Sequence, residues 1–292
     1  MNDTVRNILN KFKQDSMLNK LIYINLAVFI LIKLIDIVFM LFGINISNPF
    51  INWFSAYANI KNCITHPWGV VTYMFVHEDF LHILFNLLWL YWFGRIFSEY
   101  FNHRQLMNLY LGGGIAGALL FILIYNLSPT LNESTAIAIG ASAAIYAIVL
   151  ATAVYVPNYT VYLMFLGQVK IKWIAFFAVL SDIATLNGSN TGGHIAHIGG
   201  AVFGILFIYY LKRGIDITSW IGKICDKIVV LFQPRKKMKV HYRRTKPEYE
   251  FNQRRNDQQK EIDAILEKIS KSGYNGLTNE EKQILFKNSK NI

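Results

Sequence analysis

The chain has 292 residues, 53% of them hydrophobic, and its mean hydropathy is +0.31. Such an apolar composition excludes an ordinary soluble domain, because the apolar residues also gather in long blocks. The formal net charge of +11 comes entirely from the tails: residues 1–20 hold four basic and two acidic residues, and residues 212–292 hold nineteen and ten. By the positive-inside rule, both tails are expected in the cytoplasm.

Six apolar blocks predict six membrane-spanning helices, at residues 21–42, 81–97, 106–127, 141–156, 171–186 and 195–211. A span needs about 20 residues, so the three shortest blocks must recruit flanking residues to cross. An even number of spans places both termini inside, and the short loops agree: Arg104, Lys170 and Lys172 are inner, and only Lys61 is outer. No signal peptide is expected, since residues 1–20 are polar. The predicted class is an all-α integral membrane protein.

The basic tails are expected to meet anionic lipid headgroups rather than nucleic acid, because they contain no recognisable nucleic-acid module. The two cysteines, Cys63 and Cys225, fall on opposite sides of the membrane in this topology and cannot pair. Neither cysteine has a partner at the spacing of a metal site. No cofactor is predicted.

In the first predicted span, Lys33 and Asp36 lie three residues apart and are expected to pair, because isolated charges are costly in lipid. Residues 43–76 form a long outer connection rich in aromatic residues, which favours a segment lying in the membrane interface. The second span follows a polar entry that contains His77, and it carries His82 and Asn86 near its start. His82 and Asn86 are four residues apart and share a helix face, and His77 is expected at the helix mouth.

Small residues mark the later spans. The third contains Gly112, Gly113, Gly114 and Gly117, and the sixth contains Gly200 and Gly204. This spacing lets helix backbones approach closely, so the sixth helix is expected to pack tightly against a partner.

The fourth span carries Ser142 with Tyr146 four residues later, on one helix face. Taken alone, such a serine most often bonds a backbone carbonyl one turn earlier. Its position suggests more, because spans two, four and six all run from outside to inside in this topology. His82, Asn86, Ser142 and His197 each lie near the start of one of these spans, so all four are expected at a similar depth near the outer leaflet.

An alcohol nucleophile needs a base within hydrogen-bond reach and donors for the developing oxyanion. Ser142 is the candidate nucleophile and His197 the candidate base, with Tyr146 stacked on the imidazole. His82 and Asn86 are candidate oxyanion donors, together with the Ser142 backbone N–H. No acidic residue is placed to complete a triad: Asp182 is the nearest in sequence, but its place at the end of span five makes it a weak candidate. A Ser–His dyad is therefore predicted.

These motifs resemble the rhomboid family of intramembrane serine proteases over residues 20–212. The resemblance rests on the order and spacing of His77, His82 and Asn86, of Gly140, Ser142 and Tyr146, and of His197, Gly199, Gly200 and Gly204, with Trp68 before Thr72 and Phe75. It implies six helices around a water-filled outer cavity. It also implies cleavage of other proteins' transmembrane segments near their outer ends.

Two departures from the family pattern stand out. Ala143 follows the serine where the family usually has glycine, and Gly69 follows Trp68 where the family often has arginine. His194 is a second candidate for the general base, because it lies three residues before His197 on the same face. His197 is favoured, since Gly200 and Gly204 stand at the expected offsets from it.

Three alternatives stay open at this point: an inactive relative that binds membrane helices, a transporter or channel with a histidine proton relay, and metal ligation by His77 and His82. A bacterial plasma membrane is the expected location. The sequence names neither a substrate nor an oligomeric state.

Beyond the membrane region, residues 213–256 are expected to form a basic, irregular linker, and residues 257–292 a small cytoplasmic helical hairpin. Gly273 is expected to end the first helix of the hairpin. Thr278 and Glu281 are expected to form a capping box for the second.

Overall fold

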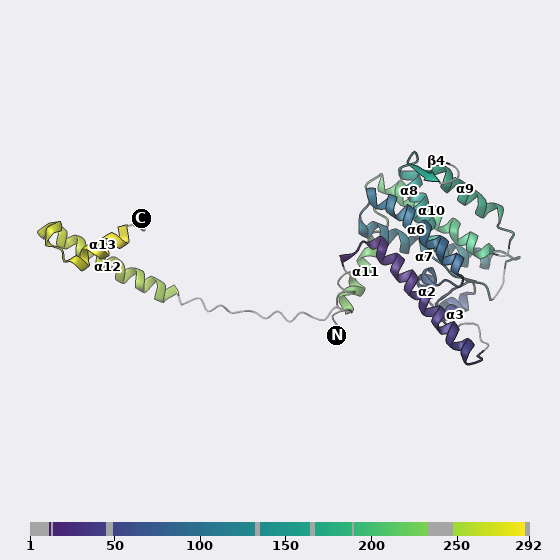
Figure 1. Cartoon of the computed structure of the whole chain (residues 1–292), viewed down its shortest axis with the longest axis horizontal. Helices are drawn as coiled ribbons and strands as arrows, with labels where there is room; N and C mark the ends of the chain where they lie inside the picture. The colour runs from purple at the N-terminus through teal and green to yellow at the C-terminus, as the bar shows by residue number, and fades with distance from the viewer. Residues whose placement is uncertain are drawn as a thin grey trace. The chain divides into compact units, whose positions relative to one another are not determined.

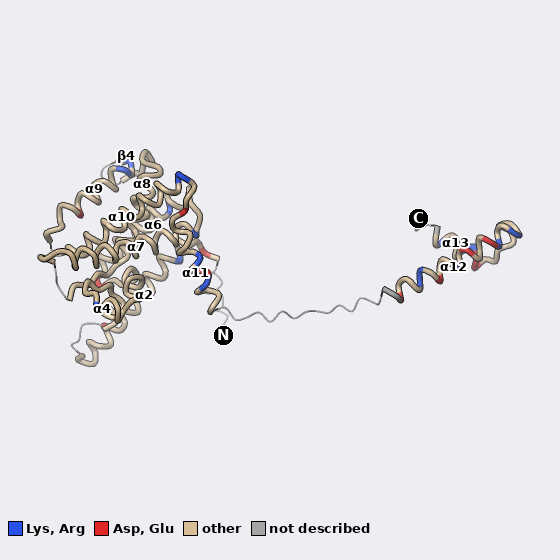
Figure 2. Tube along the Cα trace, turned by 180° about the vertical axis from the view of Figure 1, so that it is seen from behind, with Lys and Arg blue, Asp and Glu red and all other residues tan. Residues whose placement is uncertain are grey.

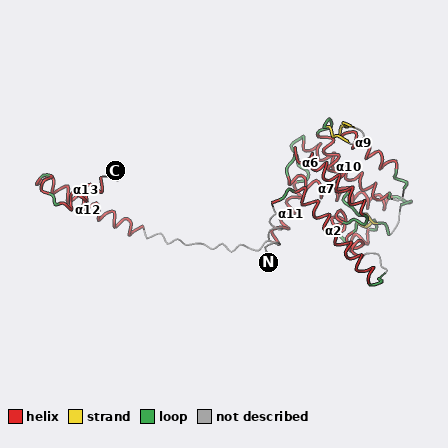
Figure 3. Tube along the Cα trace, viewed as in Figure 1, coloured by secondary structure: helices red, strands yellow, loops and turns green. Residues whose placement is uncertain are grey.

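The computed structural model describes residues 12, 14–44, 49–131, 135–163, 167–188, 190–232 and 248–289. The chain divides into two compact units, Met1–Gln233 and Pro234–Ile292, which are described separately (Figure 1). Helices dominate both units, and the strands are short (Figure 3). Residues 1–11, most of the predicted N-terminal segment, lie outside the described residues.

Each of the six predicted apolar blocks forms a helix in the first unit: α2 (Met17–Leu41), α6 (Phe80–Tyr100), α7 (His103–Leu127), α8 (Ser142–Tyr155), α9 (Ile171–Ala184) and α10 (Thr191–Leu211). Among the described residues, α2, α6, α7 and α10 are long and apolar enough to cross a membrane. Helices α8 and α9 have 14 residues each, fewer than the roughly 17 that a span usually needs. The chain is thus an integral membrane protein, and the count of six spans stays a prediction.

The long connection that was predicted to be outer is folded into short elements: α3 (Pro49–Phe54), β1 (Ala56–Tyr57), α4 (Ile60–Thr65), α5 (Gly69–Thr72) and the 3-10 helix η1 (Tyr73–Phe75). Trp68 Nε1 donates a hydrogen bond to the Trp53 carbonyl oxygen at 2.7 Å, and the two indole rings lie 5.1 Å apart. A Cβ on Gly69 would overlap the Ser55 carbonyl oxygen. The close approach of these two backbones explains why glycine, rather than a long side chain, stands after Trp68.

Two strand pairs interrupt the predicted all-helical pattern. Strand β1 pairs antiparallel with β2 (Ile137–Ala138), with Ala56 opposite Ala138. Strand β3 (Thr160–Leu163) pairs antiparallel with β4 (Gly167–Lys170). Elements this short leave no hydrophobic period in the sequence, so only the tertiary structure reveals them. The β1–β2 pair joins the connection between α2 and α6 to the segment that leads into Ser142.

Helices α7, α8 and α10 pack most closely, and α8 is buried along most of its length. A Cβ on Gly200 would overlap the Ala143 carbonyl oxygen, and a Cβ on Gly204 would overlap the Ala147 carbonyl oxygen. The backbones of α10 and α8 are therefore in direct contact, as small residues permit. The expected tight packing of the sixth helix is confirmed, and its partner is α8.

Figure 2 marks Lys and Arg positions of the first unit at β4 and at α11 (Ser219–Phe232). In α2, the predicted pair of Lys33 and Asp36 is present, with 3.1 Å between Nζ and Oδ2. Helix α11 was not predicted, because it lies in the range 213–256 that was expected to be an irregular linker. Its apolar side chain Ile221 is buried against Gly112 of α7, which supplies the tertiary contact that orders it.

The second unit contains α12 (Glu248–Ser272), the 3-10 helix η2 (Tyr274–Gly276) and α13 (Asn279–Ser289). Helix α12 begins well before residue 257, within the predicted linker. Gly273 adopts a φ of 73° directly after α12 ends. The predicted capping box is present: the Thr278 N–H donates to Glu281 Oε2 at 2.8 Å, and the Glu281 N–H donates to Thr278 Oγ1 at 3.3 Å.

Candidate active site

Ser142 is the first residue of α8 and follows a tight turn. Gly140 has a φ of 107°, and its N–H donates to the Tyr73 carbonyl oxygen at 2.9 Å. A side chain on Gly140 would come within 2.6 Å of His82 Nε2, so the turn needs glycine for both conformation and space. The free N–H groups of the first helical turn lie beside Ser142, and they form the positive end of the helix dipole.

His77 supports this turn from behind. Its side chain is fully buried, and its Nε2 accepts a hydrogen bond from the Ala141 N–H at 3.3 Å. Burial, with a smaller contribution from neighbouring His82, lowers the pKa of His77 to about 3. The ring is therefore neutral, as an acceptor nitrogen requires. His77 lies behind the wall of the cavity described next.

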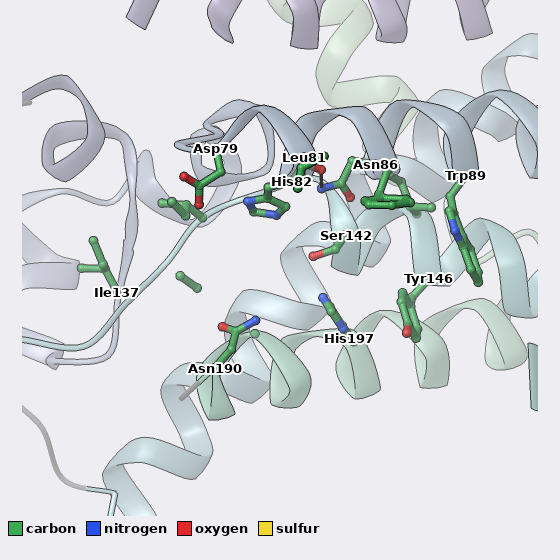
Figure 4. A pocket seen from close by; sticks show the side chains of 15 residues that line it. Asp79, Leu81, His82, Asn86, Trp89, Ile137, Ser142, Tyr146, Asn190 and His197 are labelled. Carbon is green, nitrogen blue, oxygen red and sulfur yellow. Dashed lines mark hydrogen bonds between the residues drawn. The ribbon is translucent and has the colours of Figure 1, made fainter. Parts of the chain in front are cut away.

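A cavity of about 560 Å³ opens between α6, α8, α10 and the segment around β2. Figure 4 shows its lining side chains, with the His197 imidazole below Ser142 in that view. Five of the six predicted site residues line this cavity: His82, Asn86, Ser142, Tyr146 and His197. Residues from three separate helices, expected at a common depth, therefore meet in one place.

His197 is held against Tyr146, as the sequence predicted. The two rings are stacked, with centroids 4.5 Å apart and planes inclined by 17°. Among the described residues, Ser142 Oγ has no hydrogen-bond partner. Catalytic hydrogen bonds often form at full strength only with substrate in place, so the shared cavity is the relevant geometry here.

His194 occupies a different environment from His197. Its Nδ1 lies 2.7 Å from Asp182 Oδ1, and its Nε2 lies 3.2 Å from Thr185 Oγ1. Both ring nitrogens thus have protein partners, and His194 does not line the cavity. The geometry favours His197 over His194 as the base.

Asp182 lies beside His197, and the expectation that no acidic residue is placed there, with Asp182 only a weak candidate, was wrong. The Asp182 side chain is only 7% exposed, and its Oδ1 lies 3.1 Å from His197 Nδ1. The last turn of α9 packs against the first turns of α10, which brings Asp182 to both histidines. One sequence signal pointed here: an ionisable residue inside a predicted span is a functional candidate by default.

The oxyanion candidates lie on α6. Asn86 is buried, and its Nδ2 donates to the His82 carbonyl oxygen at 2.9 Å. An amide nitrogen carries two hydrogens, so a second donor is available to the cavity that Asn86 lines. The His82 ring also lines the cavity, and its centroid lies 5.1 Å from that of His77.

Ala143 does not narrow the cavity. Its side chain is buried on the α7 side of α8, where a Cβ on Gly117 would lie 2.6 Å from the Ala143 Cβ. The methyl group thus takes space that Gly117 leaves open. The departure from glycine after the serine is accommodated in the helix interface.

The fold and the cavity define a helical membrane protein in which Ser142 and His197 line one cavity. Comparison with known families identifies the class: the Rhomboid domain model matches residues 65–214, and the chain belongs to the rhomboid family. A second model, described as a family of unknown function (DUF6576), matches residues 247–291.

Curated relatives agree with this assignment. The chain is 29% identical over 175 residues to RHOMBOID-like protein 12, mitochondrial, of Arabidopsis thaliana, covering 56% of this chain and 51% of the relative. It is 26% identical over 160 residues to Rhomboid protein 1, mitochondrial, of Saccharomyces cerevisiae, covering 53% and 45%. It is 26% identical over 187 residues to Rhomboid-like protease 3 of Toxoplasma gondii, covering 60% and 66%. The chain thus spans about half the length of the first two relatives.

Proposed function

We propose that the chain is an intramembrane serine endopeptidase, with Ser142 as nucleophile and His197 as general base. The observation that carries this proposal is the shared cavity, in which Ser142, at the start of α8, faces His197 on α10 beside two side-chain donors from α6. Proteins with a transmembrane segment are the proposed substrates, cut near the outer end of that segment. Family membership and the protease named among the relatives support this reaction class.

The proposed chemistry is acyl transfer. His197 Nε2 takes the proton of the Ser142 hydroxyl while Oγ bonds to the scissile carbonyl carbon, giving a tetrahedral oxyanion. The Ser142 N–H, Asn86 Nδ2 and His82 stabilise that oxyanion. The C–N bond then breaks, and the imidazolium gives its proton to the leaving amine. Water repeats the sequence on the acyl-enzyme, releasing the second product and restoring Ser142.

The proposed topology has six spans and cytoplasmic termini. The Lys and Arg positions at β4 and α11 support it, because basic side chains favour the cytoplasmic face. In this arrangement the cavity opens toward the outer leaflet. A bacterial plasma membrane stays the proposed location, although the first two relatives named above carry mitochondrial names.

Binding of membrane helices without cleavage is the rival function. Ala143 was the feature that favoured it, and the burial of its methyl group against α7 removes that support. A proton-relay transporter needs polar groups along a path across the membrane, whereas the site residues gather in one cavity.

A fluorophosphonate probe on the detergent-purified protein tests the proposal. We expect labelling of the wild type, loss of labelling in Ser142→Ala and His197→Ala, and labelling that survives at a lower rate in His194→Ala. Loss confined to His194→Ala would overturn the assignment of the base. A folded wild-type protein that never labels would overturn the proposed activity and favour binding without cleavage.

A further inference from the structure

We infer that Asp182 is a positioning residue that holds His197 in the form required of a general base. The site would then act as a Ser142–His197–Asp182 triad rather than as a dyad. This inference rests on the proposed function and concerns the same site.

The first support is the hydrogen bond itself. Asp182 Oδ1 lies 3.1 Å from His197 Nδ1, and the two side chains are 7% and 14% exposed. An ionised carboxylate only accepts hydrogen bonds, so Nδ1 of His197 must carry the proton. A neutral imidazole has one N–H, which leaves Nε2 with its lone pair. Asp182 therefore selects the tautomer that can take a proton from Ser142.

The second support is the way Asp182 is fixed. His194 Nδ1 lies 2.7 Å from the same Oδ1, and Thr185 Oγ1 lies 3.2 Å from the other nitrogen of His194. Both Thr185 and Asp182 belong to the end of α9, whereas the histidines lie one turn apart on α10. Two Nδ1–H donors on one oxygen hold the carboxylate in place. His194 thus orients Asp182, and Asp182 orients His197.

The third support is charge. When His197 accepts the serine proton it becomes an imidazolium, with its Nδ1–H still donated to Asp182. A buried carboxylate at this distance stabilises the positive charge, and the proton stays on the imidazole. The other titratable groups facing His197 are Tyr146 from α8, His194 on its own helix and, across the cavity, His82 and Asp79 at the start of α6. Of the two acidic residues, Asp182 is the one hydrogen-bonded to His197.

A metal ion is the competing occupant, because one ligand atom from each of Asp182, His194 and His197 lies within 4.8 Å of the others. Two donors bound to one zinc ion at about 2.0–2.1 Å in tetrahedral geometry are separated by about 3.3 Å. The 2.7 Å between Asp182 and His194 is instead a direct hydrogen bond. Asp182, His194 and His197 are therefore better explained as a hydrogen-bonded cluster than as a metal site.

The test measures the rate of fluorophosphonate labelling against pH for the full chain in detergent. Wild type is compared with Asp182→Asn, Asp182→Glu and the neighbouring control Ser181→Ala. We expect Asp182→Asn to lower the plateau rate by as much as about 10⁴-fold, since an amide does not fix the tautomer as a carboxylate does. The acid midpoint of the profile should move to lower pH, because the imidazolium loses its counter-charge. Asp182→Glu should recover part of the rate, and Ser181→Ala should match wild type.

A second readout requires no variant at position 182 and no turnover. In protein labelled with 15N-histidine, the resonances of His197 are assigned by their loss in His197→Gln. We expect a protonated Nδ1 and a bare Nε2 in the wild type. This readout keeps the inference testable if Asp182→Asn does not fold.

Three results would overturn the inference while leaving the proposed activity intact: an Asp182→Asn profile equal to wild type, a bare Nδ1 in His197, or labelling that a zinc chelator abolishes and zinc restores. A rate loss in Asp182→Asn without movement of the acid midpoint would assign Asp182 to helix docking alone. If folded wild type does not label at all, the proposed activity fails, and this inference fails with it.

Discussion

Gly117 of α7 and Ala143 of α8 form a contact with room for only one side chain. A Cβ on Gly117 would lie 2.6 Å from Ala143 Cβ and 2.7 Å from the Ala196 carbonyl oxygen. Nonbonded carbon atoms pack best at about 3.5–4.0 Å, so Gly117→Ala must push α7 and α8 apart by about 1 Å. Overpacking of this kind costs about 1–3 kcal/mol, and we expect that loss in the free energy of unfolding.

The displacement should also reach the site, because Ala143 directly follows Ser142. A shift of about 1 Å in a reacting group can cost about a hundredfold in rate. We therefore expect Gly117→Ala to label far more slowly than wild type. The assay combines unfolding in detergent with the labelling rate, so that lost stability and lost alignment are measured on the same samples.

Ala143→Gly provides the rescue. Alone, it should destabilise the protein by about 1 kcal/mol, the usual cost of glycine inside a helix. In the Gly117→Ala background it removes the clash between the two methyl groups but leaves the clash with the Ala196 carbonyl oxygen, so the rescue should be partial, and the two changes should couple by at least about 0.5 kcal/mol. Ala153→Gly, on the same helix and also buried, is the matched control and should not rescue. Additive effects of Gly117→Ala and Ala143→Gly would refute the proposed contact.

Three further predictions concern single residues. Asn86→Ala should lower the turnover number of peptide cleavage by about 10²–10³-fold with little change in KM, because it removes one oxyanion donor; an effect on KM alone would contradict that role. Because the pKa of His77 falls from 6.5 to about 3 in the folded protein, the unfolded chain binds the extra proton between these values, and stability should fall as pH drops through that window. His77→Asn should flatten the dependence of the unfolding midpoint on pH, and an unchanged dependence would assign it to other groups. Thr278→Ala should destabilise the start of α13 by about 1 kcal/mol through loss of its cap, seen as faster amide exchange there; equal exchange would show that the cap contributes nothing.

Much of the membrane region could be predicted from hydrophobic length alone. Blocks of apolar residues located all six helices, since burial in lipid or in a helix bundle requires such runs. Helix α11 was not predicted because it lies in the basic tail that was expected to be an irregular linker, although its own sequence is mostly apolar and packs against α7. The strands were not predicted from the sequence because each one pairs with a distant or very short partner.

The depth of each site residue along its own helix could be predicted from the sequence. Ser142, His197, His82 and Asn86 share a cavity because each lies near the same end of its helix. Asp182 was missed because its position in the site depends on a contact between two helices. Its contact with His197 depends on how the end of α9 leans on α10, and spacing within one helix carries no information about that angle. The reasons why Gly69 and Ala143 are tolerated likewise depend on the tertiary structure, since Gly69 packs against Ser55 and Ala143 packs against Gly117.

The backbone contacts of Gly200 and Gly204 with α8 have a kinetic consequence. Helices that touch through main-chain atoms cannot separate by changing side-chain rotamers, so α8 and α10 should open to solvent as one cooperative unit, with the slowest amide exchange in the chain. Ser142 and His197 both lie on that slow unit. Asp182 lies on α9, which is less buried than α8 and exposes apolar side chains such as Phe177. A guest helix that enters past α9 would therefore disturb Asp182, while one that enters past α6 would not.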